Sequence, residues 1–175
     1  LEELRRKKDK LVLFVGAGIS KNFEGFVDWH GLVKKMAKKI GGPIKKYYSN
    51  DELLMIPEYL NIKNEKEYFK ILKRSFSSKN KVDSCFSKLF MEINPQHIIT
   101  TNYDELIEKS SSFKNDFYDV IYDDESLYSS NYNHHIIKMH GDINHLETIV
   151  LKEKDYLDYS DHHKLIETFI KALMV

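Results

Sequence analysis

The sequence predicts an α/β domain built on a mostly parallel sheet, with helices on both faces and a helical insertion. Short apolar runs typical of buried strands alternate along the chain with stretches of helical periodicity. Polar motifs directly follow three of these runs, as expected where loops leave the carboxyl ends of parallel strands. The chain has 175 residues, enough for one such domain, which we take to span residues 1–175.

The first predicted strand is the continuous apolar run 11–15, which suits a strand buried on both faces. A helix follows its Gly-containing loop, with Asp28 as the N-cap and Gly41-Gly42-Pro43 as the stop signal. The apolar face of this helix has the helical period and consists of Trp29, Leu32, Val33, Met36, Ala37 and Ile40.

Residues 51–93 are predicted to be a helical insertion within the domain. Three apolar groups mark its helices, and Asn94-Pro95 ends the last one. The groups are Leu53, Leu54, Ile56 and Leu60; Tyr68, Phe69, Ile71, Leu72 and Phe76; and Val82, Cys85, Phe86, Leu89, Phe90 and Ile93. We interpret the Lys-rich faces between these groups as solvated surface.

Strand signals return after the insertion. Residues 97–100, 118–122 and 135–139 are predicted strands, and 148–151 a further short one. A short helix is expected around Asp104–Lys109. The chain ends in a predicted helix whose apolar face comprises Leu165, Ile166, Phe169, Ile170 and Leu173.

Composition narrows the class of protein. Lysine and arginine number 27, as do aspartate and glutamate, so the formal net charge is zero and neither a membrane nor nucleic acid is expected as a direct partner. The single cysteine, Cys85, is read as a buried thiol and cannot form a multi-cysteine zinc site. The tandem pairs His134-His135 and His162-His163 do not share a face, so no metal is expected. A reducing cytoplasm is the expected compartment.

The first candidate motif is Gly16-Ala17-Gly18-Ile19-Ser20, directly after the first strand. A glycine-rich turn there lets backbone N–H groups approach a pyrophosphate closely. The full G-x-G-x-x-G pattern is absent because position 21 is lysine. On local grounds an ordinary tight turn and nucleotide binding are therefore equally good readings.

Two further motifs follow later strands. Thr100-Thr101-Asn102-Tyr103-Asp104 could reach the same sheet edge, although Asp104 could equally cap a helix and Asn102 could form a turn. Lys138-Met139-His140-Gly141-Asp142 would bring a side chain that titrates near neutral pH to that edge. The alternative is a hydrogen-bonded structural histidine. The convergence of three polar motifs on one edge favours a cofactor crevice.

Together these motifs resemble, in order and rough spacing, those of the sirtuin family. Sirtuins carry a Gly-Ala-Gly-Ile-Ser loop, a Thr-Gln-Asn-Ile-Asp segment and a His-Gly pair, and here Thr101 stands in place of Gln. Trp29 and Lys154-Asp155-Tyr156 are similar to features of the sirtuin-like branch found in bacterial defence proteins. The resemblance covers residues ~10–160 and implies a Rossmann-like fold with NAD as substrate.

The resemblance also implies roles for individual residues. Gly16, Ala17, Gly18 and Ser20, with Thr101, would bind the cofactor. Asn102 and Asp104 would position the nicotinamide ribose and the attacking water, and His140 would be the general base.

Departures from the family pattern bear on the reaction. Sirtuin deacylases hold a structural zinc with four cysteines and carry a Pro-Asp-Phe-Arg segment, and both are missing here. These departures favour hydrolysis of NAD to nicotinamide and ADP-ribose. The resemblance to the branch found in defence proteins implies an anti-phage or stress effector. The alternatives are a non-catalytic nucleotide-sensing module, and a deacylase or ADP-ribosyl transferase.

Both chain ends suggest an excerpt of a longer protein. The chain starts at Leu1 within a charged stretch and stops at Val175 within an apolar run. We therefore expect only the N-terminal part of the sirtuin-like domain, incomplete at its C-terminus and weakly active by itself. A homo-oligomer and a further C-terminal sensor domain are expected for the full-length protein.

Overall fold

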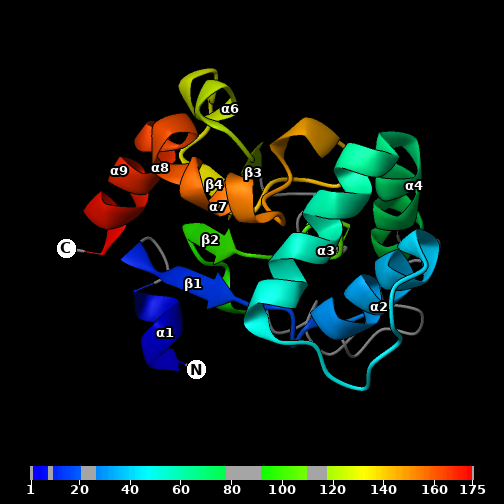
Figure 1. Ribbon diagram of the computed structural model, residues 1–175. Helices are drawn as coiled ribbons and strands as arrows, with labels where there is room; N and C mark the ends of the chain where they lie inside the picture. The colour runs from blue at the N-terminus through cyan, green and yellow to red at the C-terminus, as the bar shows by residue number, and fades with distance from the viewer. Residues whose placement is uncertain (1, 8–9, 21–26, 78–91, 110–117, 175) are drawn as a thin grey trace.

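The structure, a computed structural model, describes residues 2–7, 10–20, 27–77, 92–109 and 118–174 (Figure 1). Its strands are β1 (Val12–Val15), β2 (His97–Thr100), β3 (Tyr118–Ile121) and β4 (His134–Lys138). Its helices are α1 (Glu2–Arg6), α2 (Trp29–Ile40), α3 (Asn50–Lys63), α4 (Glu65–Phe76), α6 (Asp124–Tyr128), the 3-10 helix η4 (Leu146–Thr148), α7 (Glu153–Leu157), α8 (Tyr159–His162) and α9 (Lys164–Leu173).

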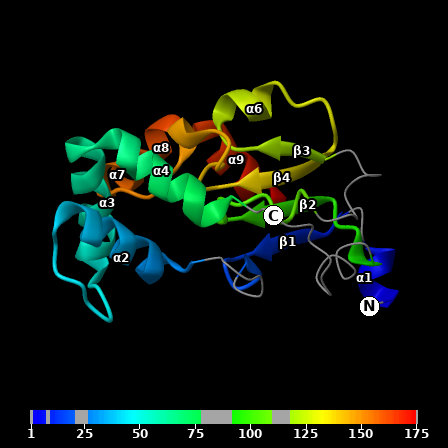
Figure 2. The ribbon, with the colours of Figure 1, turned by 90° about the vertical axis from the view of Figure 1, so that its right-hand side faces the viewer.

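The four strands form one parallel sheet in the order β1-β2-β4-β3, which confirms the predicted α/β, Rossmann-like class. Val15 lies opposite Thr100, and Thr100 lies opposite Lys138. The last residues of β1, β2 and β4 are therefore level with one another. Figure 2 shows the four arrows pointing the same way, with α2, α3 and α4 gathered beyond their ends.

The prediction that the first strand is buried on both faces is wrong. β1 stands at one edge of the described sheet, and the side chain of Phe14 is 65% exposed. The inner strand β2, in contrast, is buried at each of its positions. A short apolar run shows that a strand is apolar, but it does not reveal whether other elements cover both of its faces.

The helices next to the strand ends begin and end where local signals predict. The Asp28 side chain accepts a hydrogen bond from the Gly31 N–H at 2.9 Å and so caps α2. Gly41 ends α2 in the left-handed conformation, with φ 74°. A capping box between Ser49 and Glu52 begins α3.

The predicted helical stretch 51–93 is confirmed where the structure describes it, as α3 and α4. Residues 78–91 of that stretch, with Val82, Cys85, Phe86, Leu89 and Phe90, lie outside the described residues. The largest buried cluster joins α2, α3 and α4 to the segment that follows β4. Its members are Leu32, Met36, Leu60, Tyr68, Ile71, Leu72, Phe76, Ile143, Ile149 and Leu151.

The predicted terminal helix is confirmed as α9, which covers one face of the sheet. Ile166 and Ile170 pack there against Ile99, Ile121 and Ile137. The opposite face carries a second cluster. It consists of Val15, Ile98, Ile107 and Ile136.

The short helix expected over 104–109 is replaced by turns. The Asp104 carboxylate accepts the Leu106 N–H at 3.0 Å, and the backbone carbonyl of Asp104 accepts a hydrogen bond from Lys138 Nζ at 2.7 Å. Local side-chain hydrogen bonds of this kind compete with helix formation.

The strand expected over 148–151 is also wrong, because η4 and an irregular buried segment occupy these residues. The Val150 N–H donates to the His140 carbonyl at 3.0 Å, and the Val150 carbonyl accepts from the Tyr103 hydroxyl at 2.8 Å. The apolar side chains are buried as expected. The backbone, however, bonds to a loop and a side chain and makes no ladder with a strand.

Candidate functional site

The three predicted motifs meet at one pocket beyond the ends of β1, β2 and β4. The pocket has a volume of about 330 Å³, within the usual range for small-molecule sites. It is lined by Ala17, Ser20, Val27, Asp28, Trp29, His30, Leu32, Phe76, Thr101, Asn102, Tyr103, Asp104, His140, Leu151 and Tyr156. The level strand ends are the reason that the loops converge, since each loop leaves the sheet at the same height.

A chain of hydrogen bonds ties the glycine loop to the second motif. Asn102 Nδ2 donates to Ser20 Oγ at 3.0 Å, and Ser20 Oγ donates to Asp104 Oδ2 at 2.7 Å. Asn102 Nδ2 also lies 3.3 Å from the carbonyl oxygen of Gly16. All three side chains are buried. The loop after β1 is thus held against the loop after β2 by residues that both motifs supply.

The outer part of the glycine loop faces open space. Gly16, Ala17 and Gly18 are exposed, whereas Ser20 is buried. A Cβ placed on Gly16 or Gly18 would meet no atom within 4 Å. The backbone at these positions is therefore accessible to a bound group, and the Gly16 carbonyl also contacts Asn102.

One hydrogen-bonding atom of Asn102 is not used by any of the described residues. Its Nδ2 is engaged by the Gly16 carbonyl and Ser20, and its backbone N–H donates to Thr100 Oγ1 at 3.1 Å. Its Oδ1 is buried and has no partner in the described part of the chain. An unpaired buried acceptor is costly in a folded protein and marks a place where a ligand or water could donate.

Asp104 is 3% exposed and accepts hydrogen bonds on both carboxylate oxygens, from Ser20 Oγ and from the Leu106 N–H. Burial raises the pKa of this carboxyl, although the two hydrogen bonds oppose the rise. Asp104 does not cap a helix, which was the alternative interpretation. Its carboxylate accepts the Leu106 N–H within a turn. Its contacts indicate that Asp104 fixes the loop positions.

His140 lies in the turn directly after β4 and faces the pocket. Its ring packs edge-on against Tyr156, with centroids 5.6 Å apart, and makes no hydrogen bond with any described side chain or backbone group. Burial lowers the pKa of His140, and the neighbouring His163 lowers it further. The imidazole is consequently neutral at pH 7 and able to accept a proton.

Gly141 is required for the turn that presents His140. Its φ is 82°, a conformation that residues with a Cβ rarely adopt, and a Cβ there would lie 2.1 Å from the Thr148 carbonyl oxygen. The close approach brings the segment after β4 back onto the turn, where the Asp142 N–H donates to Thr148 Oγ1.

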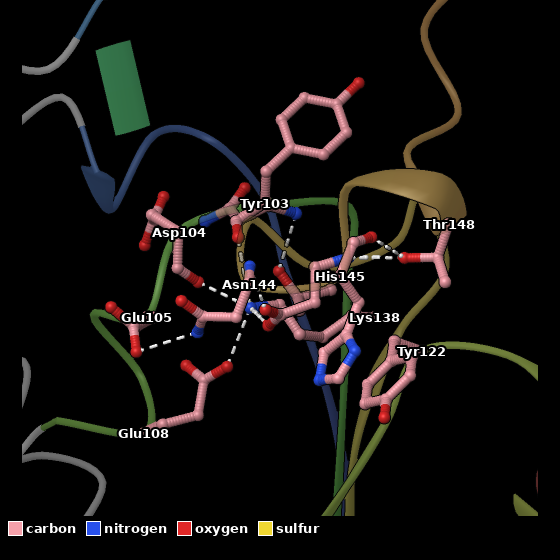
Figure 3. A network of polar contacts seen from close by, with 12 residues as sticks. Tyr103, Asp104, Glu105, Glu108, Tyr122, Lys138, Asn144, His145 and Thr148 are labelled. Carbon is pink, nitrogen blue, oxygen red and sulfur yellow. Dashed lines mark hydrogen bonds and ion pairs between the residues drawn. The ribbon is translucent and has the colours of Figure 1, made fainter. Parts of the chain in front are cut away.

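A buried lysine joins two of the motifs (Figure 3). Lys138 is completely buried, and its Nζ donates to the carbonyl oxygens of Tyr103 and Asp104 at 3.2 and 2.7 Å. The same Nζ forms ion pairs with Glu108, at 2.7 Å, and with Asp142. Although burial alone would lower the pKa of Lys138, the two carboxylates raise it, so the ammonium stays charged.

Several wall residues of the pocket were not predicted as site residues. Phe76 and Tyr103 pack with ring centroids 5.1 Å apart, and Tyr103 and Tyr156 both neighbour His140. Tyr156 follows Asp155, whose carboxylate accepts the backbone N–H groups of Leu151 and Lys152. The one feature of the sequence that could have indicated Tyr156 is the Lys154-Asp155-Tyr156 segment, which is similar to a segment of the sirtuin-like branch.

Within the described residues, no group of three or more His, Cys, Asp or Glu side chains is arranged to hold a metal ion. None of the described helices is both long enough and apolar enough to cross a membrane.

Comparison with known proteins confirms the predicted resemblance to the sirtuin family. A family model described as a SIR2-like domain matches residues 96–175, which include the second and third motifs. The fold and the three motifs at one sheet edge agree with this class.

The similar proteins include one named as a defence-associated sirtuin and others named as NAD(+) hydrolases. The chain is 35% identical to "Defense-associated sirtuin 2" of Bacillus subtilis over 173 residues, which cover 96% of this chain and 17% of that protein. It is 33% identical over 171 residues to "NAD(+) hydrolase ThsA" of Bacillus cereus (strain MSX-D12), covering 95% of this chain and 34% of the relative. A protein of the same name from Cytobacillus dafuensis is 28% identical over 171 residues, with coverages of 96% and 34%. The chain thus spans 17 to 34% of the length of these relatives.

Proposed function

We propose that this protein hydrolyses NAD to nicotinamide and ADP-ribose and acts as an effector in bacterial defence. The observation that carries the proposal is the convergence of the glycine loop, Asn102 and His140 on one pocket. The names of the similar proteins, a defence-associated sirtuin and NAD(+) hydrolases, support the same reaction.

The proposed reaction breaks the bond between the ribose C1′ and the nicotinamide nitrogen. The nicotinamide leaves with the bonding electron pair, so its positive charge is neutralised and no acid is needed to protonate it. A water oxygen forms the new bond to C1′, and His140 accepts the proton that the water loses. A neutral imidazole at pH 7 is required for this step, and burial favours that form.

Asn102 is proposed to hold the ribose and the water through its free Oδ1. Both are hydroxyl donors, and Oδ1 accepts no bond from the described residues. Asp104, whose two carboxylate oxygens each accept a hydrogen bond from the protein, is proposed to position the loop. The aromatic rings of Phe76, Tyr103 and Tyr156 give the pocket an apolar wall suited to a nicotinamide ring.

The glycine loop is proposed to bind the pyrophosphate. Gly16, Ala17 and Gly18 are exposed next to the pocket, and open space surrounds the positions where side chains of the glycines would be. Ser20 and Thr101 line the adjoining wall. Backbone N–H groups at such a turn are suited to an anion.

The test is the rate of nicotinamide release from NAD, compared between the wild-type protein and single variants. His140→Ala should lose about 10²–10⁴-fold in kcat, the usual contribution of a general base. Asn102→Ala should lower kcat more than it raises KM, because it removes orientation more than binding. The matched control is His162→Ala, since His162 is exposed and lies outside the pocket.

The products distinguish the competing functions. Equal amounts of nicotinamide and ADP-ribose, with an acetylated peptide left intact, are the expected result. Deacylation of the peptide would instead indicate a deacylase, and transfer of ADP-ribose to protein would indicate an ADP-ribosyl transferase. Binding of NAD without nicotinamide release by the full-length protein under defence-activating conditions would indicate a sensing module.

A further inference from the structure

Positive charge is concentrated on two packed helices. Between them α2 and α4 carry eight cations and two carboxylates, a net charge of +6, although the whole chain has a net charge of zero. α2 contains four lysines and no acidic residue. The cations are Lys34, Lys35, Lys38 and Lys39 on α2, and Lys66, Lys70, Lys73 and Arg74 on α4.

These helices form a groove of about 600 Å³ between them. It is lined by Lys35, Lys38 and Lys39 from α2 and by Ile71, Arg74 and Ser75 from α4. It shares no residue with the pocket that contains His140.

The groove leaves much of its charge uncompensated. Lys35 Nζ is held by the buried Ser75 hydroxyl at 3.1 Å, and Lys39 pairs with Glu67 at 3.4 Å. Lys38 and Arg74 form no ion pair with any residue that the structure describes. Clustered cations without counter-ions repel one another, and a bound polyanion would remove that repulsion.

The chemistry of the lining favours phosphate over an acidic protein surface. Lysine, arginine and serine are the side chains that contact the phosphates of nucleic acids. A protein partner would be expected to meet an apolar or aromatic anchor, and the lining offers only Ile71. The lining also contains no aromatic ring on which a base could stack, so we expect contacts to the phosphates and not to the bases.

We propose that the groove between α2 and α4 binds the phosphate backbone of nucleic acid without sequence preference. Up to four phosphates are contacted, one for each of Lys35, Lys38, Lys39 and Arg74. The proposal is independent of the reaction in the other pocket. It also differs from the expectation drawn from net charge, because a total of zero conceals the separation of the charges along the chain.

The experiment measures the affinity of the protein for a fluorescein-labelled single strand of about 20 nucleotides at several salt concentrations, by fluorescence anisotropy. Four contacts predict a slope of log K against log salt of about −2.8 for a single strand, and about −3.6 for a duplex. The variant Lys38→Gln/Arg74→Gln should reduce the single-strand slope by about 1.4, as two contacts are removed. NAD cleavage should remain unchanged in this variant.

A matched control removes two positive charges elsewhere, as Lys164→Gln/Lys171→Gln on α9, where both side chains are largely exposed. The control should keep the wild-type slope. An equal loss in both variants, or no binding at low salt, would overturn the proposal. Equally tight binding of polyglutamate, with the same loss in the groove variant, would assign the groove to an acidic protein and also overturn it.

Discussion

The side chain of Asn102 is divided between two tasks. Its Nδ2 ties the loop after β2 to the carbonyl of Gly16 and to Ser20, while its Oδ1 remains without a partner among the described residues. The Nδ2 of this amide therefore holds the two loops together, and its Oδ1 remains available as a hydrogen-bond acceptor for a ligand. Asp104, by comparison, uses both of its oxygens within the protein.

Replacing Gly141 by alanine should damage both stability and activity. The residue has φ 82°, which costs an L-residue about 1–2 kcal/mol, and its Cβ would lie 2.1 Å from the Thr148 carbonyl oxygen. Relieving that overlap must move the turn that carries His140. Thermal unfolding should show a lower Tm, and nicotinamide release should fall more than the loss of folded protein explains.

Gly42→Ala is the matched control, because its Cβ would come no closer than 3.4 Å to another atom. Equal Tm and activity losses in the two variants would show that the geometry of the His140 turn is not special.

The acidic limb of the pH–rate profile should report His140. Burial lowers the pKa of this imidazole below 6.5, so the free enzyme keeps the neutral base as the pH falls past 6.5. We expect kcat/KM to fall only at pH values below 6.5, and the limb to be absent from the residual activity of His140→Ala. A limb centred above 6.5 in the wild-type protein would contradict the assignment.

Among the elements, Lys138 adds a polar link between the loop after β2 and the turn after β4 to the strand pairing and apolar contacts that already join β2 to β4. The side chain begins at the last residue of β4 and reaches the two backbone carbonyls of Tyr103 and Asp104 after β2. Glu108 and Asp142 balance its charge. The network fixes the distance between the loop of Asn102 and the turn of His140.

Lys138→Met should therefore be strongly destabilising. Methionine has a similar length and no charge, so Asp142 and Glu108 would be left without their cation, at a cost of about 3–5 kcal/mol. Urea unfolding measures the change. Lys171→Met is the control, because this side chain is 76% exposed and its pair with Glu167 should matter by less than about 1 kcal/mol. A loss below that value in Lys138→Met would show that the network is not structural.

Two histidines at the ends of β2 and β4 that lie away from the pocket should make the fold sensitive to acid. The buried rings of His97 and His135 stack with Nδ1 atoms 3.2 Å apart, and both pack against Phe169 of α9. Burial, together with smaller effects of His135 and His134, lowers the pKa of His97 to about 4. Burial also lowers the pKa of His135, although Asp119 acts on it in the opposite direction. The folded state thus resists protonation that the unfolded chain accepts near pH 6.5.

Above pH 6.5 His97 is neutral in both the folded and the unfolded protein, so its titration costs no stability. As the pH falls from 6.5 toward 4, the unfolded chain binds a proton that the folded protein does not, and the free energy of unfolding falls by up to about 3 kcal/mol. The free energy of unfolding measured against pH should show this slope. In His97→Gln the slope should become shallower whatever the absolute stability of the variant. An unchanged slope would mean that His97 titrates normally in the folded protein.

For the whole molecule, the sequence predicted the sheet edge that carries the candidate site better than it predicted the surroundings of that edge. The motifs after 11–15, 97–100 and 135–139 could be placed together because parallel strands present their carboxyl ends at one edge. Most of the pocket wall could not be predicted, since Phe76 reaches it through the packing of α4, and only the resemblance of Lys154-Asp155-Tyr156 pointed to Tyr156. Local periodicity carries no information about such long-range packing.

Strand order and charge distribution were likewise beyond a reading of the sequence. The exposed Phe14 belongs to a run as apolar as that of an inner strand, and only the neighbours of β1 reveal its position at the edge. A net charge of zero gave no sign that α2 and α4 together carry +6. Both features arise when separate segments are brought together.

In the proposed complex NAD lies across the three loops with its nicotinamide ribose between Asn102 and His140. The most direct measurement is a crystal structure of the His140→Ala protein soaked with NAD, since this variant should bind NAD without cleaving it. We predict the pyrophosphate on residues 16–18, a ribose hydroxyl or water within hydrogen-bonding distance of Asn102 Oδ1, and the nicotinamide beside Tyr103 and Tyr156. NAD bound at any other place, with this pocket empty, would contradict the account.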